Sequence, residues 1–137
     1  MIPDLIQIKP ALEKLAEEYG LSLILLFGSQ ATGKTHKESD IDVAYLSYKQ
    51  LDLMTEARLI EDLMPIFKSH AVDIVNLQKA PPLLMKLIFD HHKVLFCRNY
   101  SKYFAYLMYA KRRYVESAPL FALRDEALGR FLRAHAR

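Results

Sequence analysis

Two short motifs carry the groups best suited to chemistry in this sequence. Gly28-Ser29 follows an apolar run, and ten residues later stand Asp40, Ile41 and Asp42. Glycine lets the backbone turn sharply and leaves room for a bulky group, while turn amides and a hydroxyl suit phosphate oxygens. Gly28 and Ser29 are therefore predicted to bind the phosphates of a nucleotide.

The aspartates are predicted to act together. Residues two apart on a strand point to the same face, so Asp40 and Asp42 would project side by side. A third carboxylate, Asp73, interrupts an apolar segment and would join them if its strand lies beside theirs. Like charges this close raise each other's pKa unless a cation such as Mg²⁺ lies between them. The alternative is a set of solvated carboxylates, with Asp73 on an edge strand facing water.

Three carboxylates beside a phosphate-binding turn indicate nucleotidyl transfer assisted by two metal ions. In this interpretation Asp40, Asp42 and Asp73 are both the metal ligands and the catalytic residues. One ion would hold the triphosphate, and the other would lower the pKa of the attacking hydroxyl. Asp73 would also receive the proton of that hydroxyl.

A second phosphate-binding pattern overlaps the first. Residues 28–35 read G-x-x-x-x-G-K-T, which as a Walker loop requires a helix to begin at Lys34-Thr35. Residues 36–42 are not convincingly helical and run directly into a strand-like stretch. The chain is also short for the repeated parallel units of that fold. The aspartate interpretation is favoured, and both interpretations place phosphate at the same turn.

These motifs resemble the G-S-x(10)-D-x-D signature of the DNA polymerase β-like nucleotidyltransferases. The matching residues are Gly28, Ser29, Asp40, Asp42 and, for the later carboxylate, Asp73. The length and residues 72–84 are similar to the minimal nucleotidyltransferases, above all the MntA-type antitoxins that pair with HEPN toxins. The resemblance implies that AMP passes from ATP, with Mg²⁺, to a tyrosine of the HEPN toxin and blocks its RNase activity.

One position departs from the family pattern. Many relatives carry Arg after the Gly-Ser pair, where this sequence has Gln30. Lys34 or Lys37 would have to supply the missing positive charge near the phosphates. The departure bears on nucleotide affinity and leaves the proposed metal ligands intact.

The pattern along the chain predicts the elements that must position these residues. Strands alternating with helices over residues 1–98 predict an α/β sandwich, a small mixed sheet with flanking helices. Residues 99–137 predict a helical appendage in the same compact unit. The expected strands are residues 21–27, 39–46, 71–76 and 93–98. The expected helices are residues 10–19, 51–64, 81–90, 101–117 and 120–134, with Met54, Ala57, Ile60 and Met64 on one face of the second.

Composition limits the classes of function. The chain has 137 residues, 52% of them apolar, and one cysteine, Cys97, which excludes an internal disulfide and fits a reducing cytoplasm. Its longest apolar run, residues 21–27, is far below the roughly 20 residues of a membrane span. The first residues lack the basic start of a secretory signal. A cytoplasmic enzyme with no membrane contact is expected.

The C-terminal segment is predicted to contact a partner. Residues 1–97 carry a net charge of −3, whereas residues 98–137 carry +6. Basic segments suit acidic protein surfaces or nucleic acid, and tyrosine with arginine favours protein interfaces. The favoured partner is a HEPN-type toxin, with direct nucleic-acid binding disfavoured. The rival functions are nucleotidyl transfer to a small-molecule hydroxyl and neutralisation of a partner by binding alone.

Overall fold

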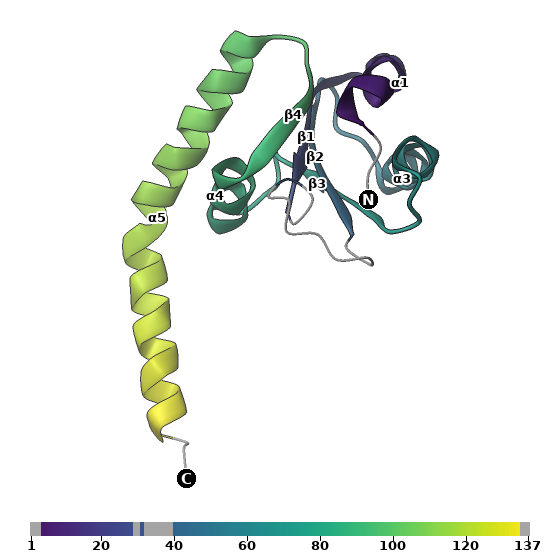
Figure 1. The fold of residues 1–137 in the computed structure, drawn as a ribbon. Coiled ribbons are helices and arrows are strands. Elements are labelled where there is room, and N and C mark those ends of the chain that lie inside the picture. The colour runs from purple at the N-terminus through teal and green to yellow at the C-terminus, as the bar shows by residue number, and fades with distance from the viewer. Residues whose placement is uncertain (1–3, 29–30, 32–39, 135–137) are drawn as a thin grey trace.

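A mixed sheet forms the centre of the computed structural model, which describes residues 4–28, 31 and 40–134. Within these residues the sheet has four strands in the order β3-β2-β1-β4 (Figure 1). β1 pairs antiparallel with β2 and β4, while β2 and β3 are parallel. The predicted fold class is confirmed. The strands are β1 (Leu21–Phe27), β2 (Ile41–Ser47), β3 (Val72–Asn76) and β4 (His92–Cys97).

Helices cover both faces of this sheet (Figure 1). Two of them, α1 (Leu5–Tyr19) and α3 (Leu53–Phe67), cover one face. The other face carries α4 (Pro82–Asp90) and the start of α5 (Tyr100–Ala134). Side chains alternate along each strand, so every strand contributes to both cores. On β2 the odd-numbered residues 41, 43 and 45 belong to the core under α1 and α3, and the even-numbered residues 44 and 46 to the core under α4.

The first helix begins earlier than the sequence predicts. It starts at Leu5 rather than Pro10, because the Asp4 side chain accepts a hydrogen bond from the Ile6 amide at 3.0 Å and caps the helix. Pro10 lies inside the helix. Gly20 ends it with a left-handed φ of 66°, as expected.

The buried face of α3 differs in part from the prediction: Ile60 and Met64 pack against the core, whereas Met54 and Ala57 are exposed. Met54 is 71% exposed, while Leu59, Leu63 and Phe67 form the buried line against the sheet. Apolar residues cover two adjoining stripes of this helix, and packing on the sheet selects between them. The helix also continues two residues beyond Pro65, because a proline in the last turn costs one hydrogen bond that the sheet contacts offset.

The C-terminal segment forms one helix, where the sequence predicts two. α5 runs without a break from Tyr100 to Ala134 with Pro119 inside it. A proline removes one backbone hydrogen bond, but good helix formers such as Ala118, Leu120 and Ala122 flank it here. The helix packs on α4 near its start and then extends past the body (Figure 1). No helix in the described ranges combines the length and apolarity needed to cross a membrane.

Candidate functional site

Asp42 and Asp73 are direct neighbours across the parallel pair of strands β2 and β3. Their Cα atoms are partners in the register of that pair. Their strand neighbours Ala44 and Val75 both pack in the core under α4. Because side chains two apart share a face, both carboxylates project from the α4 face of the sheet, at the end where β2 and β3 begin. The condition stated for Asp73, that its strand lies beside that of Asp42, is therefore met.

Gly28 lies against the same carboxylate. It follows β1 directly, and the last residue of that strand, Phe27, pairs with Asp42. A Cβ on residue 28 would overlap Oδ2 of Asp42, and its φ of 75° is one that side chains disfavour. The carbonyl of Gly28 accepts a hydrogen bond from the Ala31 amide at 3.2 Å, which closes the turn. Gly28 and the Asp42 carboxylate are thus in close contact.

The electrostatics of the site favour a cation. Burial raises the pKa of Asp42, and the charges of Asp73 and Asp40 raise it further. Each of these causes disfavours the ionised carboxylate. A divalent ion bound by oxygen ligands would remove the repulsion, because hard cations prefer carboxylates. The donor chemistry therefore fits Mg²⁺.

The third predicted ligand is less closely placed. Asp40 immediately precedes β2 and is exposed to solvent, so it acts on Asp42 through charge. Among the described residues no three His, Cys, Asp or Glu side chains are arranged as a ready metal cage. The structure thus brings together Asp42, Asp73 and Gly28, while the metal-binding role of all three aspartates stays a prediction.

Several predicted positions lie outside the described residues. They are Ser29, Gln30, Lys34 and Lys37. The contact between Gly28 and Asp42 is the feature that sequence reasoning missed. It depends on the register of β1 against β2 across the intervening loop, which residue types do not specify.

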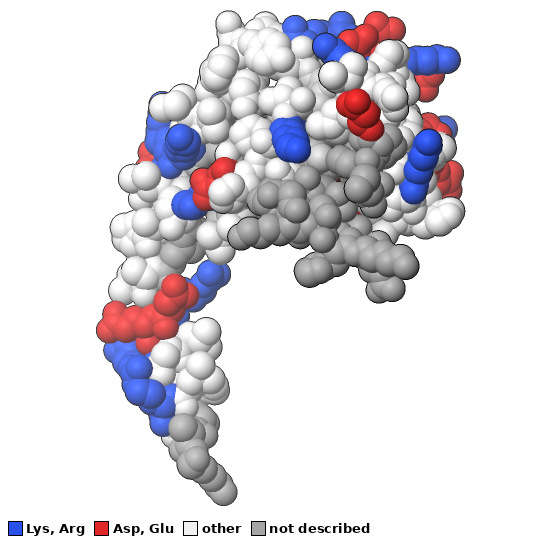
Figure 2. All heavy atoms as spheres, in the orientation of Figure 1, with Lys and Arg blue, Asp and Glu red and all other residues white. Residues whose placement is uncertain are grey.

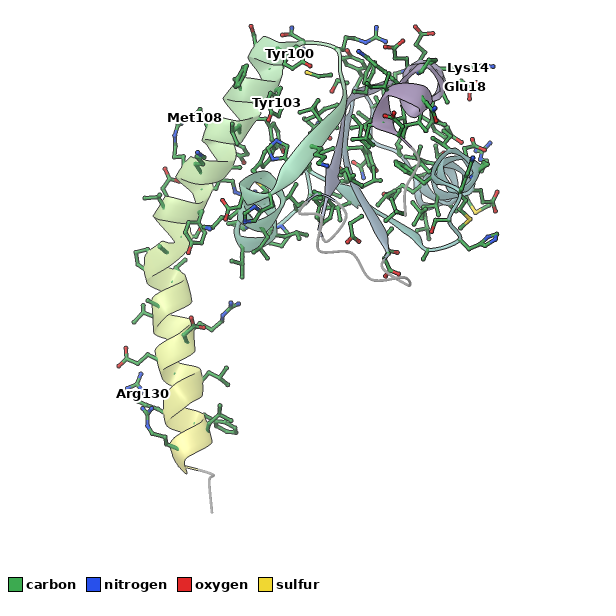
Figure 3. All side chains as sticks on the ribbon, in the orientation of Figure 1. Lys14, Glu18, Tyr100, Tyr103, Met108 and Arg130 are labelled. Carbon is green, nitrogen blue, oxygen red and sulfur yellow. The ribbon has the colours of Figure 1, made fainter. Side chains whose placement is uncertain are left out.

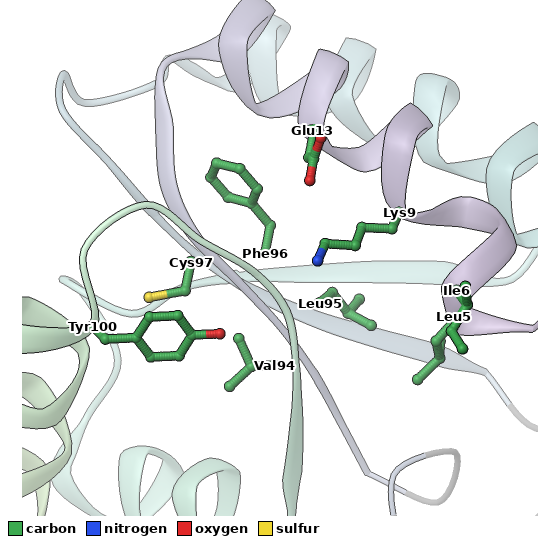
Figure 4. A pocket seen from close by; sticks show the side chains of 9 residues that line it. All are labelled: Leu5, Ile6, Lys9, Glu13, Val94, Leu95, Phe96, Cys97 and Tyr100. Carbon is green, nitrogen blue, oxygen red and sulfur yellow. The ribbon is translucent and has the colours of Figure 1, made fainter.

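A pocket of about 340 Å³ lies elsewhere, between α1 and β4 (Figure 4). Lys9 and Glu13 approach it from α1, and Cys97 and Tyr100 approach it from the opposite wall. Burial raises the pKa of the Cys97 thiol, which keeps it protonated and poorly nucleophilic. Neither Asp42 nor Asp73 lines this pocket. This pocket is therefore separate from the paired carboxylates.

His92 has a structural role. Its Nδ1 lies 3.0 Å from the carbonyl oxygen of Phe89, and its Nε2 lies 2.5 Å from the hydroxyl of Tyr103. Both ring nitrogens are thus engaged between α4, β4 and α5. His92 links the C-terminal helix to the sheet and has no free nitrogen for a metal.

The sequence is similar to one family of enzymes. Residues 8–101 match the family described as Polymerase beta, Nucleotidyltransferase. The protein adenylyltransferase MntA of Shewanella oneidensis is 37% identical over 75 residues, which cover 55% of this chain and 53% of that relative. This chain therefore spans about half the length of the curated relative it matches.

Solved structures share the fold over most of the chain. A crystal structure described as a toxin–antitoxin with AMP-PNP is 28% identical, with a TM-score of 0.75, over 88% of this chain and 98% of that chain. A crystal structure of the toxin–antitoxin MntA–HepT is 25% identical, with a TM-score of 0.71, over 90% and 98% of the two chains. The similarity in fold therefore includes residues well beyond the Gly28 turn and the aspartates.

Proposed function

This chain belongs to the polymerase β nucleotidyltransferase family, and from that membership we propose that it transfers AMP from ATP to a partner protein. The partner would be a HEPN-type toxin that the transfer neutralises, and the acceptor would be a tyrosine hydroxyl. Similarity to a protein adenylyltransferase and to a toxin–antitoxin crystallised with AMP-PNP supports this reaction. ATP is accordingly the proposed substrate.

The in-register pair of Asp42 and Asp73 carries the proposal. Asp42, Asp73 and Asp40 would hold Mg²⁺, which when bound supplies positive charge to the phosphates and to the attacking oxygen. The raised pKa of Asp42 reflects like charges that a cation would balance. A purely structural role suits these residues poorly, because their repulsion destabilises the protein without a ligand.

The reaction assigns a separate role to each protein group. The acceptor oxygen attacks the α-phosphorus, the bond from that phosphorus to pyrophosphate breaks, and AMP stays on the acceptor. A carboxylate oxygen of Asp73 takes the hydroxyl proton. The turn at Gly28, which has no side chain to obstruct the approach, would receive the β- and γ-phosphates together with Ser29. This assignment accounts for the bond that forms, the bond that breaks and the proton that is transferred.

The division of the chain is part of the same proposal. Residues 1–98 would form the nucleotidyltransferase unit, and residues 99–137 would form a helical extension. The family match ends at residue 101, close to this boundary. His92 and Tyr103 hold the two parts together, so they would act as one unit.

The direct test uses ATP labelled on the α-phosphate. Wild-type protein is incubated with Mg²⁺ and a HEPN-type toxin, and label on the toxin is measured. We expect Asp42→Asn and Asp73→Asn each to lower the transfer rate at least 100-fold, roughly the loss expected for groups that stabilise a transition state. Glu61→Gln, an exposed change on α3, is the matched control and should retain activity.

The same test separates the rival functions. If the double variant Asp42→Asn/Asp73→Asn still neutralises the toxin as well as wild type, contact alone explains the antitoxin and the proposal is wrong. If label appears on a small molecule and never on protein, the acceptor assignment is wrong. Binding of the toxin by the double variant, measured by calorimetry, is expected to persist in either case.

A further inference from the structure

A pocket of about 490 Å³ lies between one end of the sheet and the first turns of α5. Its walls include Ser22 of β1, Ser47 of β2 and side chains of α5 between residues 102 and 109. Ser47 stands five residues after Asp42 on β2, which is about 16 Å along a strand. The pocket is therefore separate from the candidate catalytic site, and its volume is typical of a site for one small ligand.

One side of α5 faces this pocket. Lys102, Tyr106 and Tyr109 line it, and their spacing of four and three residues keeps them on that side of the helix. The adjoining side carries Tyr103 into the core under α4 (Figure 3). Packing of Tyr103 on the body therefore fixes the rotation of α5 and turns Lys102 and both tyrosines toward the pocket.

The aromatic part of the lining is held in place by the protein itself. The half-buried Tyr106 donates its hydroxyl proton to the carbonyl of Leu77 at 2.9 Å. The Tyr109 ring packs edge to face on the Tyr106 ring, with centroids 5.4 Å apart. Tyr48, directly after β2, adds a third ring that is 56% exposed. Rings fixed in this way offer π faces on which a planar aromatic group can stack.

The charge beside these rings is positive. Lys102 lines the pocket, and the guanidinium of Arg98 lies 6.0 Å from the centre of the Tyr48 ring. The amide of Arg98 donates to the carbonyl of Ser22 at 3.0 Å, which places Arg98 beside the wall of the pocket. Within the part of the chain that the structure describes, neither cation forms an ion pair.

The surrounding sequence does not neutralise these cations. Residues 98–115 contain five basic residues and no Asp or Glu. Charges are mixed on other parts of the surface, since Figure 2 shows basic and acidic side chains next to one another around α1 and α3. No Asp or Glu lines the pocket either. The combination of stacked tyrosines with unpaired cations therefore suits a ligand that is both aromatic and anionic.

We propose that this pocket binds an aromatic ring that carries a phosphate group, which is the chemistry of a nucleoside monophosphate. The ring stacks on Tyr106 or Tyr109, and the phosphate accepts hydrogen bonds from Lys102 and Arg98. Gln78, which also lines the pocket, offers its amide to the polar edge of the ring. The proposal is independent of the proposed function, because none of these residues belongs to the candidate catalytic site.

The shape of the site favours a single small molecule over a longer polyanion. The three rings and Lys102 converge on one pocket, whereas a strand of nucleic acid requires stacking rings and cations repeated along a groove. A bound ligand would touch both the end of β2 and the first turns of α5. It would therefore tie α5 to the sheet at a second place, in addition to the link between His92 and Tyr103.

The test titrates the full-length chain with AMP as the probe, by calorimetry at low salt with EDTA present. Arg98→Ala/Lys102→Ala should raise the Kd for AMP about 30-fold, because two charge-assisted contacts to the phosphate are lost. Tyr109→Ala should raise it about 10-fold through lost stacking. Adenosine and inorganic phosphate should each bind at least 10-fold more weakly than AMP, because each lacks half of the recognised chemistry.

Matched controls separate this pocket from general charge and from the aspartates. Lys111→Ala/Arg112→Ala removes the same charge from exposed residues of α5 that do not line the pocket, and it should change the Kd less than twofold. Phe104→Ala, at a side chain 57% exposed, is the corresponding control for Tyr109→Ala. Circular dichroism verifies that each variant folds. The double variant Asp42→Asn/Asp73→Asn should bind AMP as wild type does.

Three results would overturn the proposal. Wild-type protein that shows no binding at about 1 mM AMP has no such site of useful affinity. Binding that is lost in Asp42→Asn/Asp73→Asn and kept in Arg98→Ala/Lys102→Ala belongs to the candidate catalytic site. A single-stranded RNA that binds at least 100-fold more tightly than AMP, and loses that affinity in Arg98→Ala/Lys102→Ala, would make the pocket part of a nucleic-acid surface. None of these results depends on whether the protein transfers AMP.

Discussion

The backbone of Gly28 lies so close to the carboxylate of Asp42 that residue 28 has no room for a Cβ. The turn that would receive phosphate and the carboxylate that would hold a cation are thus in direct contact. Any side chain at residue 28 would displace Asp42 from its place beside Asp73. The geometry of the site therefore depends on a glycine as much as on its acids.

Gly28→Ala should abolish AMP transfer and cost about 1 kcal/mol of stability, because alanine disfavours a φ of 75°. Gly20→Ala is the matched control. Residue 20 also has a positive φ, of 66°, but a Cβ added there would meet no atom within 4 Å. Both variants should unfold at lower urea concentration, and only Gly28→Ala should lose activity. Equal activity in the two variants would contradict the role of the contact.

Asp42→Asn should stabilise the protein at neutral pH in the presence of EDTA. Burial and the charges of Asp73 and Asp40 raise the pKa of Asp42 above its ordinary 3.8. The protonated acid therefore contributes stability that is present below the ordinary pKa and lost as pH rises through the raised value. Asparagine carries no charge, so the gain in Tm should be largest at neutral pH and shrink toward about pH 4. A gain that does not depend on pH would contradict this account.

Mg²⁺ should raise the Tm of the wild-type protein. An ion between the carboxylates removes their repulsion, and a ligand at 100 times its Kd stabilises by about 2.7 kcal/mol. The shift should be reversed by EDTA and absent in Asp42→Asn/Asp73→Asn. The exposed change Glu61→Gln should leave it intact. An equal shift in the double variant would place the ion elsewhere.

Pro119→Ala should strengthen the part of α5 that follows Tyr114, residues 115–134. It restores one backbone hydrogen bond in the middle of a continuous helix and is worth roughly 3 kcal/mol of local helix stability. Hydrogen exchange should slow in residues 115–134 and stay unchanged in the sheet. Unchanged exchange in the variant would mean that α5 is interrupted at Pro119 in solution.

Much of the site could be predicted because strand periodicity is local. An apolar run, a glycine and an alternating pair of aspartates place a turn and two carboxylates at the end of a sheet. The pairing of Asp42 with Asp73 is a long-range feature, and sequence reasoning could state it only as a condition on strand order. The contact between Gly28 and Asp42 could not be predicted at all, because it depends on the register of two strands that are joined by a loop.

The helices show where rules based on local sequence fail to predict helix ends and buried faces. Pro10, Pro65 and Pro119 are each expected from the sequence to begin, end or separate helices, and all three lie inside one. One missing hydrogen bond is a modest cost when neighbouring residues favour helix or pack against the sheet. The face of α3 is likewise decided by the sheet, since its apolar residues allow two orientations.

A crystal structure of the protein with Mg²⁺ and a nonhydrolysable ATP analogue tests the central claim most directly. We expect an ion bound by Asp42 and Asp73, with the β- and γ-phosphates against the turn at Gly28. A nucleotide seated in the pocket between α1 and β4, or phosphates at the turn with no ion at either carboxylate, would contradict it.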